Sequence, residues 1–167
     1  KRHIIKPVID YFRLGYNVQT NSVTFPCWDQ HDNLVGIFER NISTKRFKIP
    51  EIYPKPVYLL NECIKNNYTT VYVCESQINA LTCWSYGIPA IALFGTGSSE
   101  QYEILRKCGI RNYVLCFDGD EAGDKGREKF IKNLQLNNMI SFINVPRGKD
   151  VNDLSYNEFI SLPVYFA

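Results

Sequence analysis

The sequence lacks any long apolar run, and this absence limits the class of protein to which it can belong. No stretch approaches the roughly 20 apolar residues of a membrane-spanning helix. The first ten residues, KRHIIKPVID, contain no apolar core of a signal peptide. We therefore expect a protein of the cytoplasm that has no membrane partner.

The sequence also lacks closely spaced cysteine pairs. None of its six cysteines forms a C-x-x-C motif, and several lie inside apolar runs such as VYVCE and VLCF. This pattern favours buried, reduced thiols over disulfides or a zinc site. The sequence also has little excess of either charge. Its net charge of +2 is too small to indicate nucleic-acid binding by itself.

What the sequence does contain is a regular alternation from Thr70 onward. The apolar runs TVYVCE, AIALF, NYVLCF and ISFINVP alternate with segments of helical periodicity at 77–86, 98–108 and 122–137. In the last of these segments, Leu136 is expected to extend the apolar face. Continuous apolar strands that alternate with helices predict a parallel sheet covered on both faces, hence an α/β fold.

The part before Thr70 has a different pattern. SVTFPCWD and LVGIFERN indicate two strands joined by the polar turn QHDN, with a short helix near 7–14 before them and the proline-rich IPEIYPKP after them. We expect a small α+β subdomain over residues 1–65 and an α/β domain over 66–167.

Carboxylates follow the predicted strands. Glu75 ends the first strand, Asp118 and Asp120 end the third, and Asp150 follows the fourth. Because ligands bind beyond the carboxyl ends of parallel strands, these side chains should converge there. Hard oxygen ligands without His or Cys suit Mg²⁺ or Mn²⁺. A solvated acidic turn remains the alternative, and the stretch FGTGSS fits either a phosphate-binding turn or a plain strand-to-helix turn.

Four ordered motifs resemble the TOPRIM domain of bacterial primases, topoisomerases and some nucleases. They are Glu75 after its strand, GIPAIALFGTG, FDGDEAG and GKDVND. The first part is similar to the amino-terminal subdomain of the DnaG-type primase RNA polymerase core, in the segments FRLGY, DNLVGIFER, KRFKIPE and KPVYLLNEC. The resemblance covers nearly the whole chain.

This resemblance implies an enzyme, a DNA-directed RNA polymerase of the primase type. It would use Mg²⁺ or Mn²⁺ to synthesise RNA primers from nucleoside triphosphates on a single-stranded DNA template. A replicative helicase, separate or fused, would be its partner. The implied catalytic residues are Glu75, Asp118 and Asp120. The implied metal ligands are these three and Asp150. The implied nucleic-acid or nucleotide contacts are Arg40, Lys45, Lys55 and Lys149.

Three positions depart from the family pattern. Ser76 stands where the family has glycine, and Asn79 and Asn152 stand where it has acids. These departures keep two alternatives open, a TOPRIM nuclease that hydrolyses phosphodiesters and a non-catalytic nucleic-acid-binding module. No cysteine spacing typical of the family's zinc module is present, so we expect a fragment of a longer phage, mobile-element or bacterial protein.

Overall fold

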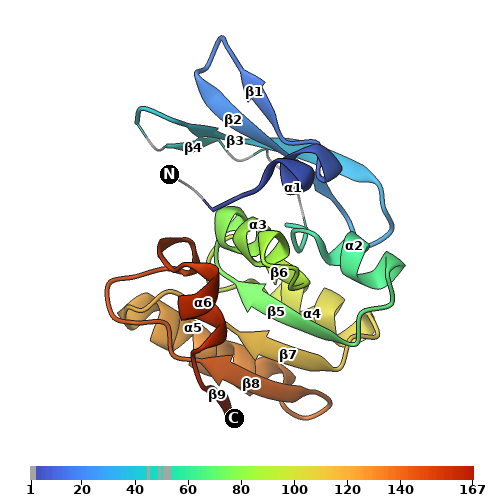
Figure 1. Ribbon diagram of the computed structural model, residues 1–167. Coiled ribbons are helices and arrows are strands. Elements are labelled where there is room, and N and C mark those ends of the chain that lie inside the picture. The colour runs from blue at the N-terminus through green and yellow to red at the C-terminus, as the bar shows by residue number, and fades with distance from the viewer. Residues whose placement is uncertain (1–2, 45, 49, 51–53) are drawn as a thin grey trace.

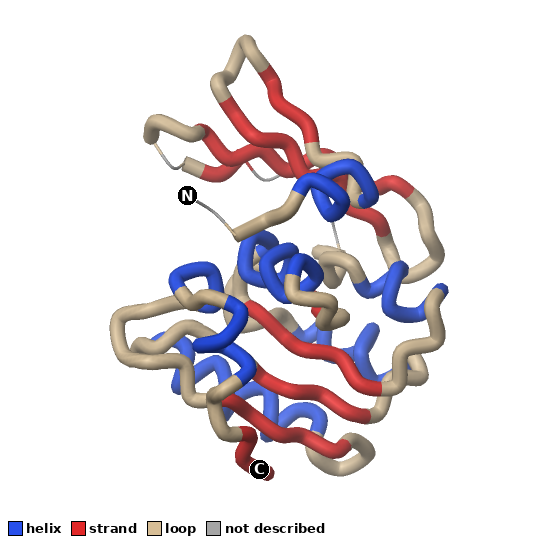
Figure 2. Tube along the Cα trace, in the orientation of Figure 1, coloured by secondary structure: helices blue, strands red, loops and turns tan. Residues whose placement is uncertain are grey.

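The computed structural model describes residues 3–44, 46–48, 50 and 54–167. Two sheets with their helices make up the fold (Figure 1), and Figure 2 shows one helix of the larger, mainly parallel sheet lying between that sheet and the antiparallel sheet. The helices are α1 (Lys6–Tyr11), α2 (Leu60–Lys65), α3 (Gln77–Ser85), α4 (Ser99–Lys107), α5 (Glu121–Leu134) and α6 (Tyr156–Ile160), with the 3₁₀ helix η1 (Val151–Asp153). The strands are β1 (Gly15–Asn17), β2 (Ser22–Trp28), β3 (Leu34–Asn41), β4 (Phe47–Lys48), β5 (Thr70–Cys74), β6 (Ala90–Ala92), β7 (Asn112–Leu115), β8 (Met139–Ile143) and β9 (Val164–Phe166).

The first sheet is an antiparallel meander in the order β1-β2-β3-β4. The predicted hairpin is formed by β2 and β3, with Phe25 opposite Phe38. Its turn is held by Asp29, whose Oδ1 accepts backbone N–H groups two and four residues further on. Both phenylalanines are buried in a core cluster that also contains residues of α3, so one face of the meander belongs to the core.

The second sheet confirms the predicted α/β architecture. Its order is β6-β5-β7-β8-β9, and all neighbours are parallel except β9. Helices α3, η1 and α6 share one core with the meander, and α2, α4 and α5 pack in a second core (Figure 1). The segment before β5 also contacts this sheet, because Tyr58 forms a bridge with Ala92. The domain division between residues 65 and 66 stays a prediction.

Helix α5 ends earlier than the periodicity predicts. It stops at Leu134, and the following residues turn toward β8. Leu136 is therefore not on the apolar face but 92% exposed, so this expectation was wrong. No helix in the described part of the chain is long and apolar enough to cross a membrane.

The thiols are where apolar runs predict them. All six cysteines are free, five are buried, and Cys108 is half-buried. Three of the buried ones come together in the core, Cys74 at the end of β5, Cys116 just after β7 and Cys83 on α3.

Candidate active site

Glu75 and Asp118 meet at the carboxyl ends of two neighbouring strands. The parallel register of β5 and β7 pairs Val73 with Leu115, so the residues after each strand lie side by side. The backbone N–H of Asp118 donates to Oε1 of Glu75 over 3.2 Å. The structure thus brings these two predicted site residues together.

The glycine between Asp118 and Asp120 explains how a third loop reaches them. The backbone N–H of Gly119 donates to the carbonyl of Lys149, and the N–H of Gly148 donates to the carbonyl of Gly119, both over 2.9 Å. A Cβ atom at Gly119 would overlap the carbonyl oxygen of Pro146. Only glycine allows this close approach, which brings the loop before Asp150 beside the two aspartates.

Two of these carboxylates have raised pKa values, because they are buried and close to other negative charges. Burial, followed by the charges of Glu75, Asp150 and Asp120, raises the pKa of Asp118 to about 7. The pKa of Glu75 is also raised, chiefly by burial and also by Asp120. Crowded hard oxygen donors with raised pKa values are the donor set that a divalent cation would neutralise, so these residues fit Mg²⁺ or Mn²⁺.

Two of the four carboxylates also have structural roles. Asp120 is the N-cap of α5 and accepts the N–H of Gly123 over 2.8 Å, while Asp150 caps η1 by accepting the N–H of Asp153 over 3.1 Å. Among the described residues, no three carboxylates have ligand atoms all within 4.8 Å of one another.

A hydrogen-bond network behind Asp118 was missed by the sequence analysis. Nδ2 of Asn79 donates to Oδ1 of Asp118 over 3.0 Å, and Oδ1 of Asn79 accepts the backbone N–H of Asn152 over 3.3 Å. Asn152 in turn donates to the hydroxyl of Thr82. The two asparagines that stand where the family has acids are therefore in contact, through the side chain of Asn79 and the backbone N–H of Asn152. Both positions have asparagine where the family pattern has an acid, and this shared change could have indicated that the two residues are in contact.

A cavity connects the carboxylates with the first sheet. It has a volume of about 280 Å³, and Glu75, Asp118, Phe47 and Phe94 are among its lining residues. Each of the two aromatic rings makes a cation–π contact with a predicted cation. The guanidinium of Arg40 lies 4.9 Å from the ring centre of Phe47, and the ammonium of Lys55 lies 5.9 Å from that of Phe94.

Of the other two predicted cations, the structure describes only Lys149. Lys149 is exposed on the loop bonded to Gly119, next to the acidic residues. Lys45 lies outside the described residues. The cavity is thus lined by two carboxylates and by two aromatic rings, each of which also contacts a cation. Carboxylates and nearby cations are the groups that a metal-bound, phosphorylated ligand would require.

Asp118 also borders a larger cavity on its other side. This cavity has a volume of about 440 Å³ and includes Arg127 and Arg147 in its lining. Both guanidinium groups pair with the carboxylate of Asp124, at 2.9 and 2.6 Å. Because Asp118 borders the same cavity, the two guanidinium groups face two carboxylates, and the lining has no clear excess of positive charge.

Comparison with known proteins decides the family. Residues 72–155, half of the chain, match the Toprim-like family. The chain belongs to the Toprim-like family. The matched range begins in β5 and ends after η1, so it contains all four predicted metal ligands. TOPRIM domains bind divalent metal ions, which agrees with the donor set described above.

Several similar sequences are DNA primases. The DNA primase of Buchnera aphidicola is 27% identical over 81% of this Toprim-like chain and 26% of its own length, and that of Campylobacter jejuni is 28% identical over 79% and 24%. The uncharacterized protein MG010 of Mycoplasma genitalium is 28% identical over 84% of this chain and 69% of its own length. The chain therefore spans about a quarter of the length of the primases that it matches.

Solved structures show the same fold. The catalytic core of DnaG superposes with a TM-score of 0.75 at 20% identity, over 93% of this chain and 66% of that one. The Aquifex aeolicus primase, with zinc-binding and RNA polymerase domains, gives a TM-score of 0.80 at 18% identity, over 98% and 54%. The fold of this Toprim-like chain is that of a DnaG-type primase core, including the first sheet.

Proposed function

We propose that this chain is the catalytic core segment of a DNA primase that synthesises short RNA primers on single-stranded DNA. The observation that carries the proposal is the cavity lined by Glu75, Asp118, Phe47 and Phe94, because a cation lies over each of the two aromatic rings. A nucleotidyl transfer needs carboxylates that hold metal and cations that bind phosphate near one phosphorylated ligand, and these residues supply both kinds of group.

The proposed roles combine the family resemblance with the positions of the described residues. Glu75, Asp118, Asp120 and Asp150 would hold Mg²⁺ or Mn²⁺, which when bound neutralises phosphate charge and activates the attacking hydroxyl. Arg40, Lys45, Lys55 and Lys149 would bind the template backbone and the nucleoside triphosphate. Asn79 would orient the carboxylate of Asp118 through its 3.0 Å hydrogen bond.

A replicative helicase is the proposed protein partner. The related structures include the primase fragment of the bacteriophage T7 primase-helicase protein, with a TM-score of 0.67 at 19% identity over 91% of this chain. Copurification of a helicase with this chain tests for a separate partner, and a helicase sequence in the same polypeptide would show a fused one.

One observation favours a second candidate, a nucleic-acid-binding module without catalysis. Asn79 and Asn152 replace two acids and make contact with each other, so the number of carboxylates available to metal is reduced. A TOPRIM nuclease remains the third candidate, although the first sheet and its cations would not be needed for hydrolysis.

The deciding experiment incubates the chain with single-stranded template, the four nucleoside triphosphates and Mn²⁺. Short RNA products that depend on template and vanish in Asp118→Asn support the primase. Template cleavage without RNA supports the nuclease. Template binding with neither product supports the non-catalytic module.

A further inference from the structure

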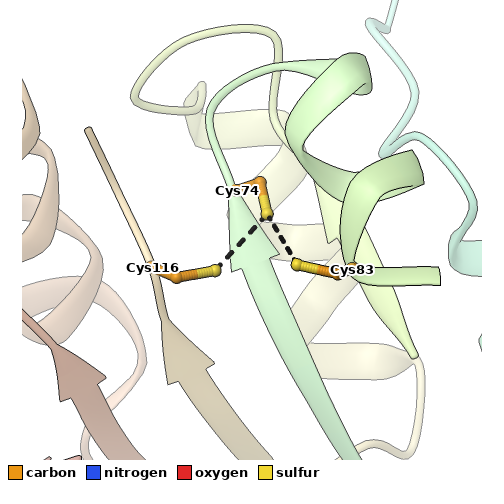
Figure 3. A group of neighbouring side chains, drawn as sticks. All are labelled: Cys74, Cys83 and Cys116. Carbon is orange, nitrogen blue, oxygen red and sulfur yellow. Dashed lines mark hydrogen bonds between the residues drawn. The ribbon is translucent and has the colours of Figure 1, made fainter. Parts of the chain in front are cut away.

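Three cysteines gather in the core behind the carboxylates. Sγ of Cys74 lies 3.4 Å from Sγ of Cys116 and 3.9 Å from Sγ of Cys83, and all three sulfur atoms lie within 4.8 Å of one another. Figure 3 shows the three side chains pointing toward one another from different elements. Each residue is completely buried.

The fold produces this convergence from distant parts of the sequence. Cys74 is the last residue of β5, Cys116 follows the neighbouring β7, and Cys83 lies on α3, which covers these strands. The group belongs to an apolar core cluster that also contains Ala80 and Val151. Within the part of the chain that the structure describes, no ligand atom of a fourth Cys, His, Asp or Glu joins the group.

We propose that Cys74, Cys83 and Cys116 form a binding site for a soft, thiophilic metal ion, and that Cu(I) is the ion that fits it. A metal ion in one plane with three sulfur atoms, at bonds of about 2.3 Å, needs sulfur atoms about 4.0 Å apart. The separation from Cys74 to Cys83 already has this value, and the separation from Cys74 to Cys116 has to widen slightly.

The number and type of donors select the ion. Structural zinc sites almost always have four ligands in a tetrahedron, and the described residues supply three. Thiolate ligands select Cu(I), whereas Mg²⁺ and Mn²⁺ prefer carboxylate oxygen. The soft site and the adjacent hard site would therefore not compete for the same ion.

Burial also favours an ion that bonds strongly to sulfur. Cu(I) displaces thiol protons to solvent as it binds, and because the site lies in an apolar core, only strong metal–sulfur bonds can offset the cost of placing an ion there. The bound ion would tie β5, β7 and α3 together directly behind Glu75 and Asp118. The inference does not depend on the proposed primase activity.

The test is an anaerobic titration of the fully reduced chain with Cu(I) in competition with the chelator bathocuproine disulfonate. We expect the parent to retain one equivalent, with X-ray absorption that shows three sulfur neighbours at about 2.3 Å. Because outer-shell partners alone change metal affinity about 10- to 100-fold, Cys83→Ala should lose more than about tenfold.

Cys63→Ala is the matched control, because Cys63 is equally buried but lies in the other core cluster. It should keep the parent's affinity, and circular dichroism checks that both variants are folded. Three results would overturn the proposal: no Cu(I) retained by the parent, equal retention by folded Cys83→Ala, or nitrogen or oxygen neighbours around the copper. If Cys83→Ala does not fold, the parent's stoichiometry and X-ray absorption decide.

Discussion

Asn79 donates a hydrogen bond from Nδ2 to Oδ1 of Asp118 over 3.0 Å, although the two residues lie 39 positions apart. The orientation of the amide is fixed at its other end, where Oδ1 accepts the backbone N–H of Asn152. Asn79 is completely buried. A neutral donor therefore supports the most strongly perturbed carboxylate of the site, at a position where the family pattern has an acid.

Asn79→Asp tests this contact. The change removes the donor and buries a second carboxylate beside Asp118, so we expect a lower melting temperature than the parent in metal-free buffer. A cation bound between the two carboxylates relieves the repulsion, so millimolar Mn²⁺ should raise the melting temperature more in the variant than in the parent. Thermal melts with chelator and with Mn²⁺ measure both effects.

Asn79→Ala is the control for this prediction, because it removes the donor without adding charge. It should be destabilised in both buffers and show no enlarged response to Mn²⁺. An equal Mn²⁺ response in the parent, Asn79→Asp and Asn79→Ala would mean that the ion binds away from Asp118.

The two roles of Asp120 can be separated by choosing the substitution. Asp120→Ala removes both the metal ligand and the N-cap of α5, so we expect loss of primer synthesis by about 10²-fold or more and a stability loss of about 0.5–2 kcal/mol. Asp120→Ser keeps a capping oxygen, so it should lose the same activity while keeping most of the stability. Primer assays and urea denaturation measure the pair. Full activity in Asp120→Ser would remove Asp120 from the metal ligands.

The sequence predicted those parts of the fold that depend on local pattern. Continuous apolar runs and intervening helical periods were sufficient for the parallel sheet, and strand order then placed Glu75 next to Asp118. The prediction that Leu136 extends the apolar face of its helix was wrong. The end of a helix depends on how the chain turns into the next strand, which periodicity does not describe.

Contacts between distant segments could not be predicted in this way. Asn152 meets Asn79 across 73 positions, and Cys116 meets Cys74 across 42, only because neighbouring elements of the α/β unit bring them together. No local periodicity carries such information, since each of these residues is an ordinary buried residue within its own segment.

The cations that lie over Phe47 and Phe94 give a prediction about DNA binding. Arg40→Ala and Lys55→Ala should each weaken binding of single-stranded DNA and reduce the salt slope by roughly one unit or less, because each phosphate contact releases counterions. Lys107→Ala is the matched control, since Lys107 lies on α4, which packs in the other core, and pairs with Glu103. Fluorescence anisotropy over a range of salt concentrations measures the slopes. A parental slope in both test variants would place the template elsewhere.

The raised pKa of Asp118 makes the metal-free protein less stable as pH rises. An unfolded aspartate ionises near pH 4, whereas burial and then Glu75, Asp150 and Asp120 raise the pKa of Asp118 in the folded state to about 7. Between these values the folded chain binds more protons than the unfolded chain, so the contribution of Asp118 to stability is complete below pH 4 and is lost as pH rises through 7. Asp118→Asn keeps the acceptor for Asn79 but does not titrate, so its melting temperature should match that of the parent at low pH and exceed it above pH 7.

Divalent metal competes with the proton on Asp118, so the Mn²⁺-induced increase in the melting temperature of the parent should grow as pH rises through the same range. This increase should be largely absent in Asp118→Asn. Melts of both proteins across pH, with chelator and with Mn²⁺, measure these curves. Parallel curves in chelator, together with equal Mn²⁺ responses, would show that Asp118 is an ordinary ionised acceptor and not the centre of a metal site.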